Sequence, residues 1–296
     1  MASQDMQAVR DLLASFPDSS SLSLAELRAV YDQMGQSFPL PAEVTLQPVE
    51  VNGVKAEWVK ADLATEAKTV LYVHGGGYII GSTNSHRHQV AAISQATGAS
   101  VLSLNYRLAP ENPHPAAVED SVAAYRCLLE QGIEANNIMI AGDSAGGGLT
   151  IATLVALREQ GIELPAGGIC ISPWVDLTNS AESILTKAEA DPICTETILI
   201  QMATAYLQGQ DAKTPLASPL YADLQGLPPL LIQVGTEEIL LDDSLNLEKR
   251  AKEAGVPVTL EIWEDMVHVW HFFHPMLKEG REAINRIGDF YKTHTA

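Results

Sequence analysis

The stretch MIAGDSAGGGL, residues 139–149, places one serine among four glycines directly after a short apolar run. Three interpretations are open: a phosphate-binding loop, a flexible connection, or a turn so tight that only glycine fits beside the serine. A Walker-type phosphate loop needs a lysine after its last glycine, and the dinucleotide fingerprint needs glycines at its first, third and sixth positions, so neither motif is present. The G-x-S-x-G pattern, a strand-to-helix turn that exposes a serine nucleophile, is instead matched by Gly142, Asp143, Ser144, Ala145 and Gly146.

The glycines that flank Ser144 have a steric explanation in such a turn. Gly142 and Gly146 lie two residues before and after the serine, where the strand and the helix crowd together and side chains do not fit. The turn also directs the Ala145 backbone N–H, at the N-terminus of the helix, toward the place where an oxyanion would form. A single G-x-S-x-G match is common by chance, so an ordinary strand-to-helix turn remains an alternative at this point.

A second glycine-rich segment favours the catalytic interpretation of Ser144. It follows an apolar run at 69–73 and consists of His74, Gly75, Gly76 and Gly77. Consecutive glycines let backbone N–H groups approach a substrate oxygen, as the second half of an oxyanion hole requires. His74 itself is expected to hold this loop by a hydrogen bond rather than to transfer protons.

A carboxylate and a histidine follow Ser144 in the chain order of a hydrolase triad. The run PLLIQVGTEE places Glu237 and Glu238 just beyond a predicted strand, and VTLEIWEDMVH places His268 just beyond another. The nearby Asp242 and Asp243 fall at the start of a predicted helix, where we expect them to cap it and complement its dipole.

From about residue 48 the chain alternates between short apolar strands and helical segments. The run VEVNGVKAEWVK indicates an antiparallel hairpin, and apolar strands are predicted at 69–73, 100–106, 137–142, 167–173, 229–235 and 258–264. Near-continuous apolar strands that alternate with helices indicate an α/β fold with a mostly parallel central sheet and helices on both faces. We expect a single domain over residues 1–296.

Two segments outside this rhythm are expected to form a helical cap. Helical spacing relates the apolar residues Met6, Val9, Leu13 and Phe16. A second helix begins at Ser23, with Glu26 three residues on, and is predicted to end at Gly35. These helices of residues 1–45 either pack on the core or cover a pocket. The insertion at 179–215 is predicted as helix, turn and helix.

From about residue 45 to its end, the chain resembles the bacterial hormone-sensitive-lipase-like esterases, a family with the α/β-hydrolase fold. The resemblance lies in the segments HGGG, NYRLAPENPHPAA, GDSAGGG, SPWVDL, DPI, SPLYADLQGLPPLLIQVG and DMVHVWHFF. It implies carboxylic ester hydrolysis by a serine triad with Ser144 and His268, and a cap over the acyl site. It also implies an oxyanion hole made by the amides of Gly76, Gly77 and Ala145.

One position departs from the family pattern. Where the family usually shows Asp-Pro-Leu followed by two more acidic residues, this chain has EILLDD, which aligns Glu238 with the usual aspartate. Because triads are defined by geometry rather than by residue identity, we predict that Glu238 is the catalytic acid.

Other residues that invite attention are expected to have structural roles. A metal site normally recruits further ligands and supporting carboxylates, so no metal is expected at His86, His88, His271 and His274. Arg107 and Glu111 are expected to form buried polar bonds. Three apolar residues are candidates for the wall of an acyl pocket, namely Phe38, Leu199 and Met202.

Composition limits the partners of this protein. Eighteen basic and 37 acidic residues give a formal net charge of −19, which disfavours nucleic acid and anionic lipid as partners. We expect a small-molecule ester substrate, no cofactor and no integral membrane association, because no apolar stretch has the length of a membrane helix. Three cysteines without metal-type spacing indicate thiols in a reducing compartment, hence a cytoplasmic location. A homodimer is compatible with these features.

Two alternatives remain open from the sequence. An amidase or carbamate hydrolase would use the same triad. A small-molecule receptor on the same fold is a second alternative, since a plant hormone receptor that resembles this family has lost its histidine. The presence of His268 favours the enzyme.

Overall fold

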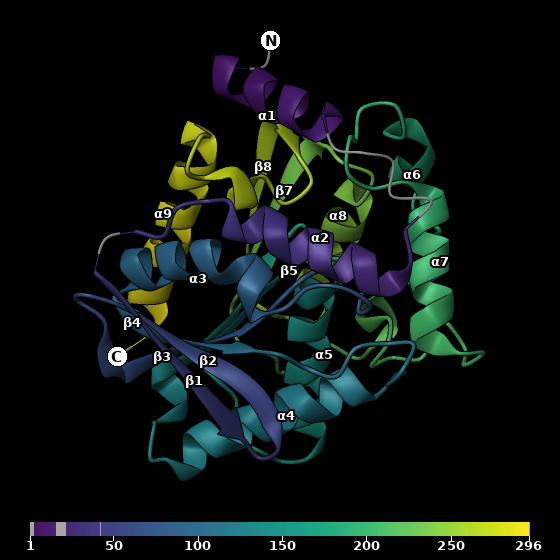
Figure 1. Ribbon diagram of the computed structural model, residues 1–296. Coiled ribbons are helices and arrows are strands. Elements are labelled where there is room, and N and C mark those ends of the chain that lie inside the picture. Colours follow the sequence, from purple (N-terminus) through teal and green to yellow (C-terminus); the bar gives the residue numbers. More distant parts are fainter. Residues whose placement is uncertain (1–2, 16–21, 42, 296) are drawn as a thin grey trace.

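A computed structural model describes residues 3–15, 22–41 and 43–295 of the chain (Figure 1). Within these residues, eight strands form one sheet in the order β1-β2-β4-β3-β5-β6-β7-β8. The strands are β1 (Val44–Val51), β2 (Val54–Ala61), β3 (Thr65–Val73), β4 (Ala99–Leu104), β5 (Ile138–Asp143), β6 (Gly167–Ile171), β7 (Leu230–Glu237) and β8 (Val258–Val267). The predicted α/β fold with a mostly parallel sheet is therefore confirmed.

The sheet is antiparallel only at one edge among the described residues. β1 and β2 form the predicted hairpin, with Val51 paired to Val54 across an Asn52–Gly53 turn in which both residues have positive φ. β2 runs antiparallel to β4, and β3 to β8 pair in parallel. The chain adds β4 on one side of β3 and β5 on the other, so the loops after β3 and β5 meet at a switch point, where ligands bind in such sheets.

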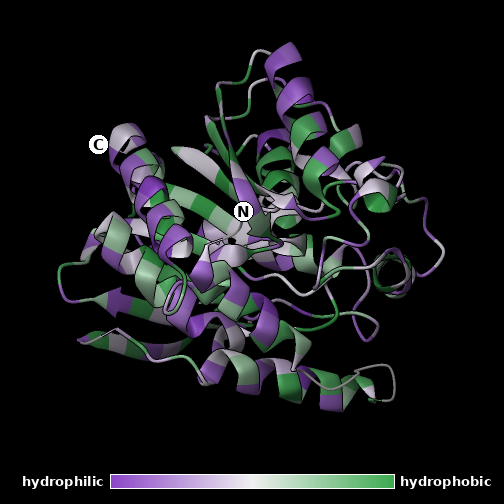
Figure 2. Cartoon of the chain, turned by 90° about the horizontal axis from the view of Figure 1, so that it is seen from above, coloured by the Kyte–Doolittle hydropathy of each residue, from purple (hydrophilic) through white to green (hydrophobic). Residues whose placement is uncertain are grey.

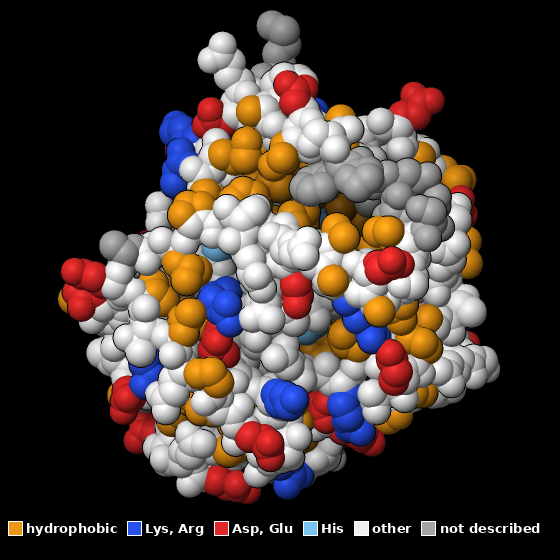
Figure 3. Space-filling model, viewed as in Figure 1, with side chains coloured by type: hydrophobic (Ala, Val, Ile, Leu, Met, Phe, Trp, Pro, Cys, Tyr) orange, Lys and Arg blue, Asp and Glu red, His pale blue; other side chains and the backbone are white. Residues whose placement is uncertain are grey.

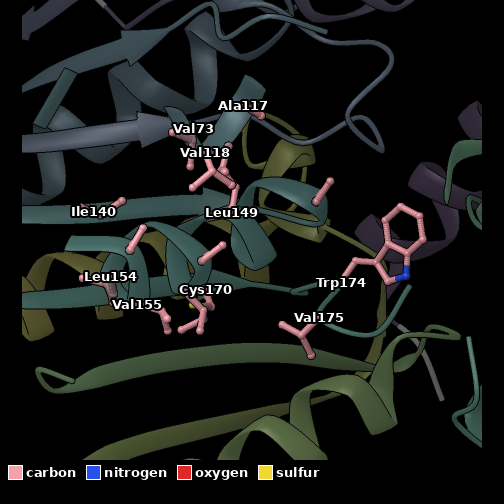
Figure 4. Close-up of a cluster of buried hydrophobic side chains, with 14 of the residues drawn as sticks. Val73, Ala117, Val118, Ile140, Leu149, Leu154, Val155, Cys170, Trp174 and Val175 are labelled. Carbon is pink, nitrogen blue, oxygen red and sulfur yellow. The ribbon is translucent and has the colours of Figure 1, made fainter. Parts of the chain in front are cut away.

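Helices cover both faces of the sheet, as its buried strands require (Figure 1). α3 (Thr83–Thr97) and α9 (Lys278–His294) pack on one face, and α4 (Ala116–Glu130), α5 (Ala145–Glu159) and α8 (Leu241–Glu253) pack on the other. Figure 4 shows part of the core between β5 and α5, where Ile140, Leu149 and Leu154 lie close together. Seen from above in Figure 2, the central strands are largely hydrophobic and the surrounding helices carry hydrophilic residues.

In the described part of the chain, four α-helices lie outside these layers: α1 (Gln4–Ala14), α2 (Leu24–Gln36), α6 (Ser183–Thr186) and α7 (Glu196–Leu207). The predicted capping box of α2 is present, because Ser23 and Glu26 exchange side-chain to backbone hydrogen bonds. The first helix predicted in the insertion is only the single turn α6. Phe16 lies outside the described residues.

Gly35 does not end α2 as predicted, because the helix continues to Gln36. The glycine serves close packing instead: a Cβ at this position would collide with the backbone of Ser85 in α3. Glycine is therefore needed at position 35 for the contact between the two helices and not to terminate α2.

The prediction of buried polar bonds for Arg107 and Glu111 is wrong in part. Arg107 pairs with the buried Asp120, but its own side chain is 46% exposed. Glu111 is 55% exposed and pairs with Arg28 of α2 at 2.7 Å. The YRLAPE segment therefore connects the body of the protein to α2.

No helix in the described part of the chain is both long and apolar enough to cross a bilayer.

Candidate active site

Ser144 occupies a strained turn between β5 and α5. Its backbone has φ 54° and ψ −122°, a region that residues with side chains rarely adopt. Neighbouring hydrogen bonds hold this conformation: the Ser144 N–H donates to the Ile171 carbonyl at 2.8 Å, and its carbonyl accepts from Trp174 at 2.9 Å. A Cβ on Gly142 or Gly146 would collide with the Val73 carbonyl oxygen of β3, so both positions need glycine as the sequence predicted.

The structure brings Ser144, His268 and Glu238 into one chain of hydrogen bonds. His268 Nε2 lies 2.9 Å from Ser144 Oγ, and His268 Nδ1 lies 2.7 Å from Glu238 Oε2. These three side chains lie at the ends of β5, β8 and β7. Along the chain, His268 is 124 residues from Ser144 and 30 residues from Glu238. A carboxylate at Nδ1 leaves Nε2 free to face the hydroxyl, the arrangement that activates a serine.

A second serine holds the Glu238 carboxylate. Glu238 Oε1 accepts from Ser172 Oγ at 2.8 Å and from the Gly235 N–H at 2.7 Å, while Ser172 Oγ accepts from the Val269 N–H at 3.1 Å. Ser172 thus connects the carboxylate to the residue that follows His268. The sequence reasoning missed Ser172; the only signal for it was its place in the SPWVDL segment after a predicted strand.

The surroundings of His268 favour its protonated form. Burial lowers the pKa of the imidazole, but contacts with Cys194 and with Glu238 outweigh burial and raise that pKa well above its usual value. Burial also raises the pKa of the Cys194 thiol. Cys194 is a second site residue that the sequence did not identify.

The three backbone amides predicted for an oxyanion hole lie at the same site. Gly76 and Gly77 line the cavity with Ser144, and Ala145 is the first residue of α5. Among the described residues, none of these three N–H groups donates to a protein acceptor. Gly76 and Gly77 have φ values of 105° and 59°, which glycine adopts without strain. Free donors at a nucleophile suit a developing negative charge.

Asp143 and His74 support the glycine loop. The carboxylate of Asp143 accepts from the Gly75 N–H at 3.0 Å and from the Tyr72 hydroxyl at 2.6 Å, and its other oxygen lies 3.3 Å from His86 Nε2. His74 Nδ1 lies 2.7 Å from the Gly75 carbonyl. Burial lowers the pKa of His74 to about 3, so the ring is neutral at physiological pH.

The remaining histidines of the sequence patterns have protein partners. His88 Nε2 contacts the Phe272 carbonyl at 2.8 Å, and His271 Nε2 contacts Gln233 Oε1 at 2.8 Å. His274 stacks on His88 with ring centroids 5.5 Å apart. Within the described ranges, no group of three potential ligands has a geometry that could hold a metal ion.

The other acidic residues of the β7–α8 stretch bind different partners. Glu237 lies 3.5 Å from Lys187 and does not contact His268. Asp242 and Asp243 lie in the first turn of α8, where acidic residues complement the helix dipole as predicted, but the prediction that they cap the helix is wrong, because neither makes a capping bond. Asp242 accepts from the Ser183 N–H, and Asp243 accepts from the N–H groups of Val175 and Asp176 at 2.8 and 3.0 Å. The two aspartates therefore connect the start of α8 to segments that are distant along the chain.

A cavity of about 540 Å³ opens at Ser144 and His268. Its wall is largely apolar and includes Leu13 of α1, Leu27 and Met34 of α2, and Leu199 and Met202 of α7. The candidates Leu199 and Met202 therefore border the cavity, whereas Phe38 does not and instead packs against His88 and Phe272. On the face shown in Figure 3, hydrophobic side chains gather over α1 and between α1 and α2.

The sheet order, the strained serine turn and the glycine loop together define the class of α/β-hydrolases. A family described as "alpha/beta hydrolase fold" matches residues 70–272. An "Acetyl-hydrolase" of Streptomyces hygroscopicus is 47% identical over 295 residues, which cover 100% of this chain and 98% of the relative.

Solved structures agree with this comparison. A crystal structure of an esterase from the bacterial hormone-sensitive lipase family is 48% identical, with a TM-score of 0.97 over 100% of both chains. A structure of EstE5, soaked with p-nitrophenyl butyrate, is 49% identical, with a TM-score of 0.95 over 99% of both chains. The chain belongs to the hormone-sensitive-lipase-like family of α/β-hydrolases.

Proposed function

We propose that the protein is a serine carboxylesterase that hydrolyses short-chain esters through an acyl-enzyme. The observation that carries the proposal is the hydrogen-bond chain Ser144–His268–Glu238 at the floor of a largely apolar cavity. Membership in a family whose relatives are named esterase and acetyl-hydrolase supports the same reaction over amide or carbamate cleavage.

In the first half of the reaction, Ser144 Oγ attacks the ester carbonyl while His268 Nε2 takes its proton. Glu238 orients the ring and stabilises the imidazolium that forms. The amides of Gly76, Gly77 and Ala145 hold the oxyanion, and loss of one such donor typically lowers kcat by about 10²- to 10³-fold. His268 then protonates the leaving alcohol, and the ester carbonyl carbon remains bonded to Oγ.

In the second half, water repeats the attack on the acyl-enzyme. His268 takes a proton from the water, the oxyanion forms in the same hole, and collapse releases the carboxylic acid and regenerates the serine hydroxyl. Glutamate in place of aspartate fits this scheme because the Ser172 hydroxyl and the Gly235 amide fix the longer side chain. All of these steps use protein groups and water.

The proposal includes a single domain over residues 1–296, with cap elements from about 1–45 and 179–215. It is supported by the cavity wall, to which α1, α2 and α7 contribute side chains above the ends of the strands. A cytoplasmic location is supported by the free thiols of Cys127, Cys170 and Cys194. A homodimer remains a prediction that light scattering would test.

A panel of matched esters and amides tests the proposed reaction. We expect p-nitrophenyl acetate and butyrate to be hydrolysed and the corresponding p-nitroanilides to react far more slowly. Ser144→Ala should abolish turnover of the esters. Its circular dichroism spectrum and melting temperature should stay close to those of wild type, because the hydroxyl contributes little to packing. Ester hydrolysis retained by Ser144→Ala would remove the central claim, and faster turnover of the anilides would favour an amidase.

A further inference from the structure

Tyr31 places a phenol in the largely apolar wall of the catalytic cavity. It belongs to α2 and borders the same cavity as Ser144 and His268. The ring packs against two aromatic neighbours, with centroid distances of 5.8 Å to His86 and 6.2 Å to Phe272. Tyr31 is half-buried, as expected of a side chain that protein surrounds but that also faces an open cavity.

The Tyr31 hydroxyl has no hydrogen-bond partner among the described residues. By contrast, the hydroxyls of Tyr72 and Tyr106, close to the same site, bind Asp143 and the His74 carbonyl. A phenol in an apolar wall is costly to dehydrate unless a bound molecule supplies a partner. Polar groups of this kind, few and fixed among apolar ones, commonly orient a ligand.

The phenol also lies near the reacting groups. After burial, the nearby carboxylate of Asp143, which precedes the nucleophile, is the largest cause that raises the pKa of Tyr31. Burial raises the pKa of Tyr31 well above its usual value, so the hydroxyl remains a neutral donor throughout the physiological range.

The position of Tyr31 is fixed by the anchoring of α2. One turn before it, Arg28 donates to the carbonyls of Ile79 and Ala109 at 2.8 and 2.9 Å and forms a two-pronged pair with Glu111. One residue after it, Asp32 accepts from Ser82 Oγ at 2.6 Å. A donor that is already in place when substrate arrives binds with less loss of conformational entropy.

We propose that the Tyr31 hydroxyl binds a second oxygen atom of the substrate, so that small esters with an ether, hydroxyl or carbonyl oxygen near the scissile ester are preferred over plain alkyl esters. The inference rests on the proposed esterase function and deepens it. A plain alkyl ester displaces water from the phenol and returns no hydrogen bond, whereas an oxygenated ester replaces that bond. The second oxygen lies in either the acyl or the alcohol part.

Two isosteric substrate pairs test the inference. p-Nitrophenyl methoxyacetate and p-nitrophenyl butyrate differ by one ether oxygen in the acyl part, and 2-methoxyethyl acetate and n-butyl acetate differ by one in the alcohol part. The measured quantity is the ratio of kcat/KM for the oxygenated ester to that for the alkyl ester. Differences in intrinsic reactivity cancel when this ratio is compared between wild type and Tyr31→Phe.

We expect Tyr31→Phe to lower the ratio about five- to tenfold for one of the two pairs, and the affected pair identifies the part of the substrate that Tyr31 binds. Tyr125→Phe is the matched control, because its phenol donates to the Glu163 carbonyl away from the cavity; it should leave both ratios unchanged. If both ratios are the same in Tyr31→Phe and wild type, or if both esters of a pair slow equally, the inference is overturned. Hydrolysis of the alkyl esters by wild type, and its loss in Ser144→Ala, tests the esterase function independently of either ratio.

Discussion

At the scale of single residues, the proposed role of Glu238 makes the sharpest prediction. Glu238→Gln keeps the shape of the side chain but removes the charge that stabilises the His268 imidazolium, so kcat should fall about 10³- to 10⁴-fold. The carboxylate raises the pKa of His268, and its loss should therefore lower that pKa. Since only the neutral imidazole accepts the serine proton, activity is lost as pH falls through this pKa, and the acid limb of kcat/KM should move to lower pH in the variant.

Glu237→Gln provides the control for that experiment. Glu237 is the neighbouring glutamate, but it pairs with Lys187 and does not contact His268. Its pH profile should coincide with that of wild type. Near-wild-type activity in Glu238→Gln together with inactivity in Asp242→Ala would show that the acid has been assigned to the wrong position.

At the scale of elements, three aspartates tie the loop after β7 to the segments that follow β6. Asp191 accepts from the Ile239 N–H at 2.9 Å, and Asp242 and Asp243 bind the amides of Ser183 and of Val175 and Asp176. Because Ile239 follows Glu238, these contacts position the loop that carries Glu238. Their partners are 48 to 68 residues away along the chain, and this explains why the sequence suggested only a local role for Asp242 and Asp243.

Asp243 makes the stability of this junction depend on pH. Burial, with the nearby Asp176, raises the pKa of Asp243 from 3.8 to about 8, so folding favours its protonated form between these values. Its contribution to stability is complete at low pH and declines as pH rises toward 8. Asp243→Asn keeps an oxygen for both amides and carries no charge. Its melting temperature, relative to wild type, should therefore rise between pH 5 and pH 8 in thermal scans; a pH-independent difference would contradict the assignment.

The contact between α2 and α3 leads to another prediction. Glycine to alanine in a helix usually stabilises by about 1 kcal/mol, but a Cβ on Gly35 would collide with the Ser85 backbone. Gly35→Ala should therefore lower the free energy of unfolding by about 1–3 kcal/mol in urea titrations. Gln33→Ala, at an exposed position of the same helix, should change it by less than about 0.5 kcal/mol. A stabilised Gly35→Ala variant would mean that the two helices do not pack this closely.

At the scale of the whole molecule, the sequence predicts those features of the fold and of the site that local residue patterns determine. Strand apolarity and glycine placement predicted the sheet and the serine turn, and chain order predicted which residues meet at the site. Ser172, Cys194 and Tyr31 were not predicted, because their environments arise only when distant segments pack together. Ser172 follows a strand, Cys194 lies in an insertion and Tyr31 lies in an amphipathic helix. None of these local settings indicates that the residue lies near His268.

The size of the cavity in the folded molecule predicts which substrates the protein accepts. A cavity of about 540 Å³, bordered by α1, α2 and α7, accommodates a small ester but not a triglyceride with three long chains. Tributyrin should therefore be hydrolysed much faster than emulsified triolein in pH-stat assays. Met202 of α7 packs so closely on Gly77 that a Cβ there would collide with its sulfur. Met202→Ala should thus raise the rate on p-nitrophenyl octanoate relative to acetate. Rapid hydrolysis of triolein by wild type would contradict the size limit that the cavity sets.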